Sequence, residues 1–262
     1  MRKMLFLLLL AVTALPALAQ DEAAREGLRI AREMDRRASG FGNLSAELVM
    51  VLMDRSGRKS LRQLRNLVRE RPDDGDLSLM VFEQPADVRG TRLLVHAHKD
   101  RDDDEWIYLP ALRRVKRISA AGKTSSFMGS EFTYEDLGAQ EVEKFDHRLL
   151  RTEPCGVDDL QCFVNERRPR LAGSGYSRQV LWIDQQEYRP WRIDYYDRKG
   201  ELLKTLLLRD YHRYLDHYWR AHRMLMKNHQ TGKSTLLLWK SFRFGNEFPP
   251  DTFDPKRLAS GH

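Results

Sequence analysis

The sequence predicts a mainly β protein: one long antiparallel sheet that curls into a half-open barrel, with helices covering its concave side. A helical hydrophobic period occurs only near the N-terminus, and after residue 43 the period changes to two. The apolar segments that follow are short and are joined by turn-rich connections, which favours antiparallel neighbours. So many antiparallel strands exceed what a flat open sheet tolerates, and the sheet should therefore curl.

The first residues have the pattern of a secretory signal peptide. Arg2 and Lys3 precede the apolar stretch Leu5–Leu15, and Ala17-Leu18-Ala19 supplies small residues before a cleavage site. The stretch is shorter than the roughly 20 residues of a membrane-spanning helix. We therefore predict that residues 1–19 are removed after Ala19 and that the mature protein is periplasmic.

The mature chain, residues 20–262, is expected to form a single domain. It would begin at Gln20, which is not a cysteine that could be acylated, so we expect a free exported protein and not a lipoprotein. We also expect a monomer. Loss of the signal peptide lowers the net charge only from +7 to +5. Export separates the chain from nucleic acid, so basic residues would meet anionic lipid headgroups, an acidic protein partner or plain water.

One amphipathic helix is predicted at the start of the mature chain, from about Asp21 to Ala38, because apolar residues recur at three- and four-residue steps. Ser39-Gly40-Phe41-Gly42-Asn43 ends it. The predicted strands are Leu44–Met53, Leu61–Glu70, Leu77–Gln84, Thr91–Ala97, Glu105–Leu109, Arg113–Ile118, Phe145–Thr152, Gln161–Glu166, Tyr176–Ile183, Trp191–Tyr196, Leu202–Arg209, Ala221–Lys227 and Thr235–Phe244.

Covering elements are needed because one face of these strands is apolar and aromatic. The N-terminal helix is the main candidate, helped by short helical pieces near Ala121–Met128 and near the C-terminus, around Phe248–Pro255. A curled sheet under such a cover encloses an apolar space. The alternative is that the protein's own side chains fill this space and that it binds nothing.

The two cysteines, Cys155 and Cys162, flank a turn at Gly156 to Asp159. In an oxidising compartment this spacing favours a structural disulfide across a hairpin tip. The Cys-x-x-Cys spacing typical of redox pairs is absent from the sequence.

The sequence contains no recognisable motif for catalysis or for cofactor binding. The sequence contains no Gly-rich phosphate loop, G-x-S-x-G elbow or His-Glu-x-x-His zinc helix. His96 and His98 share a strand face but have no matched third ligand. His212, His217 and His222 recur at five-residue steps that alternate strand faces, so coincidence is the better account. We therefore expect no enzyme activity, no cofactor and no metal.

The segment Asp104–Leu137 is the strongest functional signal. Trp106 and Tyr108 share a strand face, and a dense run of basic residues, Arg113, Arg114, Lys116 and Arg117, follows. A second aromatic cluster then appears in Phe127–Leu137, with Gly129 where the chain must turn tightly. A plain hairpin explains the first pair but not this second cluster.

These residues closely resemble the outer membrane lipoprotein-sorting proteins of the LolA/LolB-like superfamily. The pattern W-x-Y-L-P-A-L-R-R-V-x-R-I is matched at Trp106–Ile118, and F-M-G-S-x-F-x-Y-E-D-L at Phe127–Leu137. Arg89-Gly90-Thr91-x-Leu93-Leu94 extends the match upstream. The resemblance implies a LolA-like half-open barrel with a helical lid and an apolar cavity for the acyl chains of a lipid or lipoprotein. The missing lipid-attachment cysteine is a departure from LolB.

The resemblance also implies site residues and partners. We expect the wall or mouth of the cavity to be formed by Trp106, Tyr108, Leu109, Phe127, Met128, Phe132 and Tyr134. Each of these residues is also explained as part of an ordinary core. Arg113, Arg114 and Arg117 are expected to hold an anionic headgroup or to dock a membrane partner, or else to be solvated. The implied role is carriage across the envelope, with transient membrane-surface contact. The alternative is a non-carrier accessory protein that docks on a transporter of the resistance-nodulation-division (RND) type.

Overall fold

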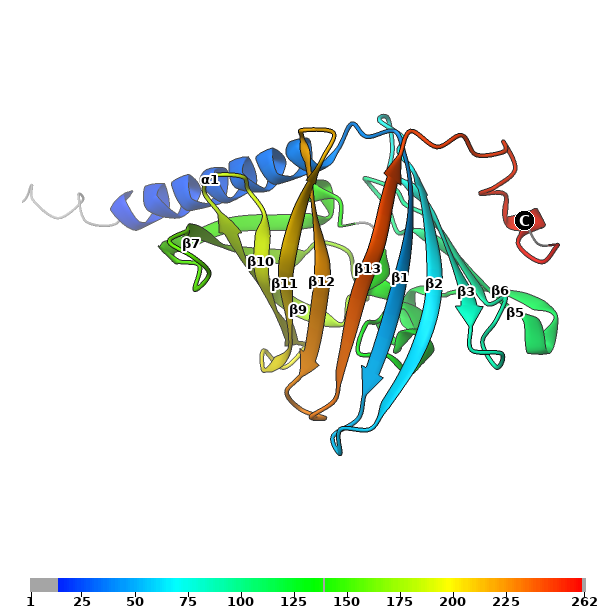
Figure 1. The fold of residues 1–262 in the computed structure, drawn as a ribbon. Helices are drawn as coiled ribbons and strands as arrows, with labels where there is room; N and C mark the ends of the chain where they lie inside the picture. The colour runs from blue at the N-terminus through cyan, green and yellow to red at the C-terminus, as the bar shows by residue number, and fades with distance from the viewer. Residues whose placement is uncertain (1–13, 139, 261–262) are drawn as a thin grey trace, which may run out of the picture.

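The computed structural model describes residues 14–138 and 140–260 and contains one sheet of thirteen antiparallel strands (Figure 1). The strands are β1 (Asn43–Met53), β2 (Lys59–Arg69), β3 (Leu77–Gln84), β4 (Arg92–His96), β5 (Asp104–Leu109), β6 (Arg114–Arg117), β7 (Phe145–Pro154), β8 (Gln161–Pro169), β9 (Tyr176–Asp184), β10 (Pro190–Asp197), β11 (Leu202–Tyr214), β12 (Tyr218–Asn228) and β13 (Ser234–Phe244). All thirteen predicted strands are present, and the predicted fold class is confirmed.

The sheet is open. Its order is β6-β5-β4-β3-β2-β1-β13-β12-β11-β10-β9-β8-β7, so β6 and β7 are the two edges. The pairing of β1 with β13 joins two runs of hairpins, and the chain must cross from β6 at one edge to β7 at the other. Residues 118–138, here called the crossover segment, make most of this connection with the short turns η2 (Ala120–Thr124), η3 (Phe127–Gly129) and α2 (Tyr134–Leu137).

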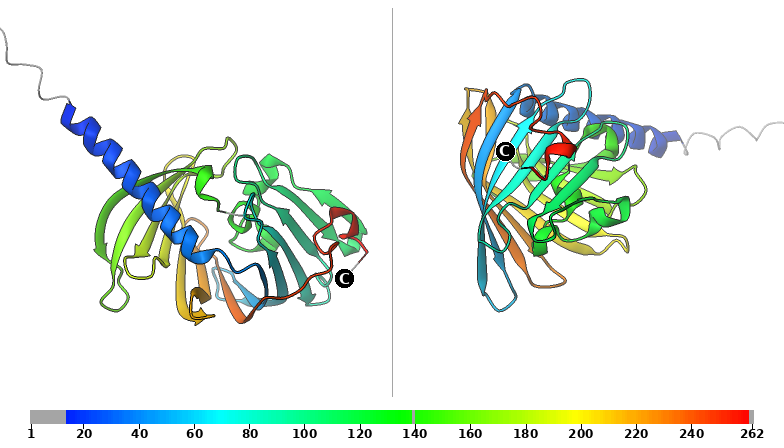
Figure 2. Two further views of the ribbon diagram at one scale, coloured as in Figure 1. Left: turned by 90° about the horizontal axis from the view of Figure 1, so that it is seen from above. Right: turned by 90° about the vertical axis from the view of Figure 1, so that its right-hand side faces the viewer.

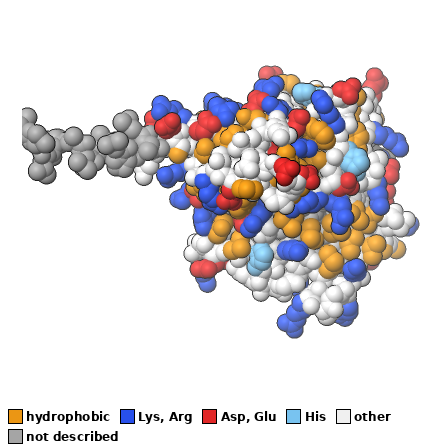
Figure 3. All heavy atoms as spheres, turned by 60° about the vertical axis from the view of Figure 1, so that its left-hand side comes forward, with side chains coloured by type: hydrophobic (Ala, Val, Ile, Leu, Met, Phe, Trp, Pro, Cys, Tyr) orange, Lys and Arg blue, Asp and Glu red, His pale blue; other side chains and the backbone are white. Residues whose placement is uncertain are grey.

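Helix α1 (Ala14–Ala38) covers one half of the sheet and packs mainly against β7 (Figure 2). It begins seven residues before the predicted Asp21, within the predicted signal peptide. The basic residues and most of the apolar stretch of that peptide lie outside the described residues. A Cβ at Gly27 would lie 2.5 Å from the backbone nitrogen of Arg148, so glycine permits this close approach of helix to strand. On the face that includes α1, basic side chains are spread among acidic and apolar ones (Figure 3).

The two faces of the sheet carry separate apolar clusters. On the inner face, Ile30 of α1 packs with Leu48, Met50, Phe82 and other strand residues in the main core. On the outer face, Phe253 and Leu258 pack against a smaller cluster of strand residues, Leu67, Leu79 and Leu94. The prediction that the C-terminal segment helps to cover the concave side is therefore wrong. Because side chains alternate in a strand, this half of the sheet also has an apolar outer face, which the C-terminal segment buries (Figure 2).

The β11–β12 hairpin extends beyond its predicted ends at Arg209 and Ala221. Its tip contains Leu215 and Asp216, which have φ values of 50° and 52°. No glycine or proline marks this turn, so the sequence pattern gave no stop signal. The other hairpin prediction is confirmed: Cys155 and Cys162 form a disulfide at the tip of β7–β8, with Cα atoms 5.1 Å apart.

The remaining short helices are η1 (Pro110–Leu112), η4 (Val142–Lys144) and η5 (Pro255–Arg257). Among the described residues, no helix combines the length and apolar character needed to cross a bilayer.

Candidate functional site

The crossover segment lies on the inner face, where it inserts its aromatic residues into the main core. Phe127 has no exposed surface, and its ring centroid lies 5.5 Å from those of both Phe82 and Tyr134. A tight loop makes this possible: Met128 and Gly129 have φ values of 50° and 76°, and the Phe127 amide donates to the Phe132 carbonyl at 2.7 Å. Four predicted cavity residues, Phe127, Met128, Phe132 and Tyr134, thus come together.

The other predicted cavity residues do not join them. Trp106 and Tyr108 do share one strand face, but it is the outer face, where they pack against the cluster that contains Phe253. Their neighbour Ile107 points inward and is 3% exposed. Leu109 ends β5 and is half-buried. The strand alternation was predicted correctly, but the face on which the aromatic pair lies depends on how the sheet curls.

A buried ion pair anchors the crossover segment to the sheet. The ammonium of Lys204 on β11 pairs with the carboxylate of Asp136, and each side chain is 2% exposed. Lys204 also donates to the Glu131 carbonyl at 3.1 Å, and the Tyr176 hydroxyl donates to Asp136 at 2.8 Å. The ammonium lies 5.2 Å and 5.3 Å from the ring centroids of Tyr176 and Tyr195. Burial, and next the charge of Asp136, raises the pKa of Tyr176 well above its usual value.

Further polar contacts hold the loop that carries Phe127. The Glu131 amide donates to the Thr235 hydroxyl at 2.9 Å, and its carboxylate accepts from the Asn228 amide at 2.7 Å. The guanidinium of Arg62 donates to the Met128 carbonyl. The crossover segment is therefore attached to β2, β9, β11, β12 and β13 mainly through single side chains. Sequence reasoning missed Lys204, although a lysine inside the apolar run Leu202–Leu208 was a usable signal.

The predicted arginines lie at the edge of the sheet. Arg113, with a φ of 47°, and Arg114 are exposed beside β6. Arg117 is also exposed, at 67% of its side chain, and pairs with Asp104. The three thus form a solvent-facing basic edge.

Two ion pairs lie at the start of β5, one to Lys144 just before β7 and one to Lys123 of the crossover segment. Lys144 pairs with Asp103, and Lys123 lies 3.7 Å from Glu105. These residues line a cavity of about 70 Å³ together with Glu135 and others. One carboxylate oxygen of Glu105, a residue 1% exposed, has no hydrogen-bond partner among the described residues. Burial, opposed by Lys123, raises the pKa of Glu105 to about 7.

We expect Glu105→Gln to stabilise the protein increasingly as the pH rises above about 4.5. Because the pKa is 4.5 unperturbed and about 7 in the fold, the wild-type protein loses stability as the pH rises between these values. The variant does not, and should be more stable by about 3 kcal/mol at pH 8 and nearly unchanged near pH 4. Urea denaturation across this pH range measures the difference, and parallel pH profiles for the two proteins would contradict the assignment.

Larger hollows lie away from the centre of the inner face. One of about 420 Å³ lies between the outer face and the C-terminal segment, where Arg65, Arg92 and Arg243 border it. Another of about 630 Å³ lies beside α1 and reaches Leu149 of β7. The centre of the inner face is filled by the protein's own side chains, among them those of the crossover segment.

An open antiparallel half-barrel whose inner face is covered by a helix and an irregular segment defines the LolA-like class of fold. A LolA superfamily protein from Nitrosomonas europaea shares this fold, with a TM-score of 0.70 and 20% identity over 87% of this chain and 96% of its own.

The chain belongs to the family of outer membrane lipoprotein-sorting proteins. A domain of Vibrio parahaemolyticus that carries this description is 46% identical, with a TM-score of 0.87, over 90% of this chain and 99% of its own. A DUF1329 family protein from Desulfovibrio piger is 32% identical, with a TM-score of 0.84, over the same shares. A family model with the description "Uncharacterized protein" matches residues 74–260. No curated protein sequence gives a significant match.

Proposed function

We propose that this protein is a periplasmic carrier that binds acyl chains of a lipid or lipoprotein on the inner face of its sheet and passes them across the envelope. The main support for this proposal is the kind of segment that covers the inner face. Its centre is occupied by the crossover segment, which joins two unpaired sheet edges and has no regular structure longer than single turns. An acyl chain would take the place of the aromatic cluster around Phe127.

The energetics of this exchange are nearly balanced. Hiding an acyl chain of roughly 16 carbons from water stabilises it by on the order of 10 kcal/mol, at about 0.8 kcal/mol per methylene. Burial of Phe127, Met128, Phe132 and Tyr134 of the crossover segment contributes at most roughly 6–12 kcal/mol, at about 1.5–3 kcal/mol for each fully buried side chain, and Met128 and Tyr134 are half-buried. Neither state dominates, so the protein could load and release cargo without nucleotide hydrolysis.

The relatives support this class of cargo, because the description of the Vibrio parahaemolyticus domain names lipoprotein sorting. We further propose that the basic edge formed by Arg113, Arg114 and Arg117 makes transient contact with anionic headgroups or with an RND-type transporter in the inner membrane. Its exposure suits docking better than cargo binding.

The carrier proposal predicts co-purifying lipid and saturable uptake of a fluorescent fatty acid by the purified protein. Asp136→Asn weakens the anchor of the crossover segment and should increase uptake several-fold, because the resident segment then competes less well. Asp146→Asn, at an exposed carboxylate, is the matched control and should leave uptake unchanged. Lipid extraction with mass spectrometry and fluorescence titration are the measurements.

Absence of both lipid and uptake, in the wild type and in Asp136→Asn alike, would rule out the carrier. Charge reversal of Arg113 and Arg114 provides a second control. It should preserve uptake but slow transfer of the fatty acid to anionic vesicles. If the wild type takes up no fatty acid, and the charge reversal of Arg113 and Arg114 abolishes binding to a transporter, the accessory role is favoured instead.

A further inference from the structure

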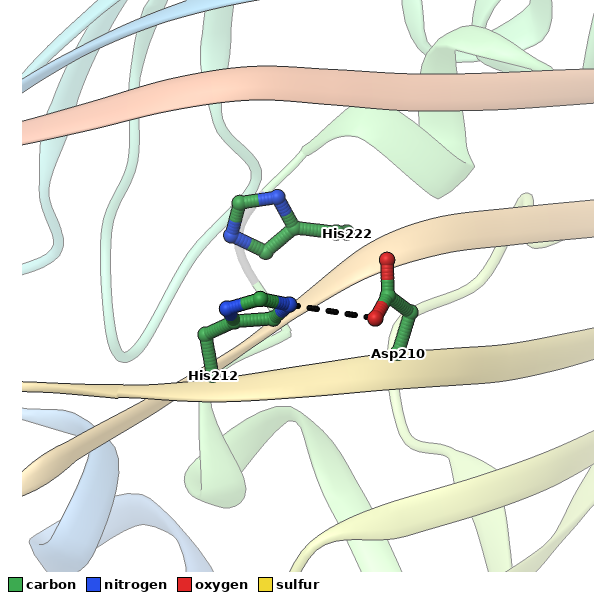
Figure 4. A group of neighbouring side chains, drawn as sticks. All are labelled: Asp210, His212 and His222. Atoms are coloured by element: carbon green, nitrogen blue, oxygen red, sulfur yellow. Dashed lines mark hydrogen bonds and ion pairs between the residues drawn. The ribbon is translucent and has the colours of Figure 1, made fainter.

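We propose that Asp210, His212 and His222 form a binding site for a divalent transition-metal ion, with Zn²⁺ as the first candidate. One possible ligand atom from each residue lies within 4.8 Å of the others. Figure 4 shows the three side chains gathered at one place on two neighbouring strands. The inference does not depend on the carrier proposal.

The register of the β11–β12 hairpin explains why the three residues meet. Tyr211 pairs with Ala221 and Arg209 with Arg223, which places Asp210 across from His222. His212 lies two residues beyond Asp210 on the same strand, and the two histidine ring centroids are 4.3 Å apart. The five-residue spacing that looked like coincidence in the sequence therefore brings two histidines together and leaves His217 at the tip of the hairpin.

The donor set is suited to zinc. Two imidazole nitrogens and one carboxylate oxygen are common Zn²⁺ ligands, and imidazole also suits Cu²⁺ and Ni²⁺. The His212 Nε2 atom already lies 3.1 Å from the Asp210 carboxylate. Both side chains are about half exposed, at 55% and 51%, so small rotations can close the remaining distances around an ion. Three protein ligands leave the fourth tetrahedral position for water or for a group from a partner.

His222 is the more fixed ligand. Its Nε2 atom lies 2.8 Å from the Tyr214 hydroxyl, and the Trp239 backbone provides a second hydrogen bond. Metal binding would replace one of these two hydrogen bonds of His222 by a bond to the ion, and the other hydrogen bond would then orient the imidazole ring.

Isothermal titration of the tag-free protein with ZnCl₂, after dialysis against a chelator, tests the site. We expect one ion per chain in the wild type. His212→Ala and His222→Ala should each weaken binding by about 100-fold or more, since loss of a ligand costs at least as much as loss of its outer-shell partner. His217→Ala removes an exposed histidine at the tip of the same hairpin and is the matched control, with unchanged affinity.

A stability measurement gives an independent readout. Zinc at about 100 times its dissociation constant should raise the Tm of the wild type by several degrees and leave that of His212→Ala/His222→Ala unchanged. Circular dichroism confirms that the variants remain folded. The proposal fails if millimolar zinc produces no binding heat, or if the double variant binds zinc as tightly as the wild type does.

Discussion

Lys204→Met is expected to lower the free energy of unfolding by about 3–5 kcal/mol. The substitution removes the cation that compensates Asp136, and the Asp136 carboxylate would remain 2% exposed with the Tyr176 hydroxyl as a side-chain donor. An uncompensated buried charge is far more costly than a buried pair or a neutral replacement. Urea denaturation at pH 7 measures the loss.

Two comparisons separate this charge effect from a simple loss of packing. Lys204→Met/Asp136→Leu removes both charges and should recover most of the lost stability, because no unpaired charge remains. Lys227→Met, at an exposed position on the neighbouring strand, should change stability by less than about 0.5 kcal/mol. A single variant that loses less than about 1 kcal/mol would show that the ion pair does not anchor the crossover segment.

Phe127→Ala is expected to cost a similar amount, about 3–5 kcal/mol, because it opens a cavity at a fully buried position. The ring contacts Phe82 on β3 and Tyr134 in the crossover segment, so its loss weakens the cover of the inner face. Under the carrier proposal the vacated volume should also favour an acyl chain, and fatty-acid affinity should rise while stability falls. Thermal denaturation with and without oleate measures both effects.

Leu112→Ala is the control for that experiment, since this leucine lies shortly before the crossover segment but is 67% exposed. Its stability should change by less than about 0.5 kcal/mol. If Phe127→Ala lowered the stability no more than Leu112→Ala does, the aromatic cluster would not be the group that competes with cargo for the inner face.

Much of the fold followed from local pattern. Alternation of apolar and polar residues located all thirteen strands, and the long basic and aromatic motifs pointed to the right family. The crossover segment was recognised as special because its second aromatic cluster exceeds what a hairpin needs. Its position on the inner face, with Phe127 among residues from distant strands, was not visible in the sequence.

By itself, the sequence determined the antiparallel strands, the disulfide between Cys155 and Cys162, and the fact that Trp106 and Tyr108 share one face of their strand. Only the tertiary structure decided that this face is the outer one and that Lys204 meets Asp136. The physical reason is that alternation records which neighbours along a strand share a side. It carries no information on which side the sheet curls around, or on which residue from a distant part of the chain arrives there.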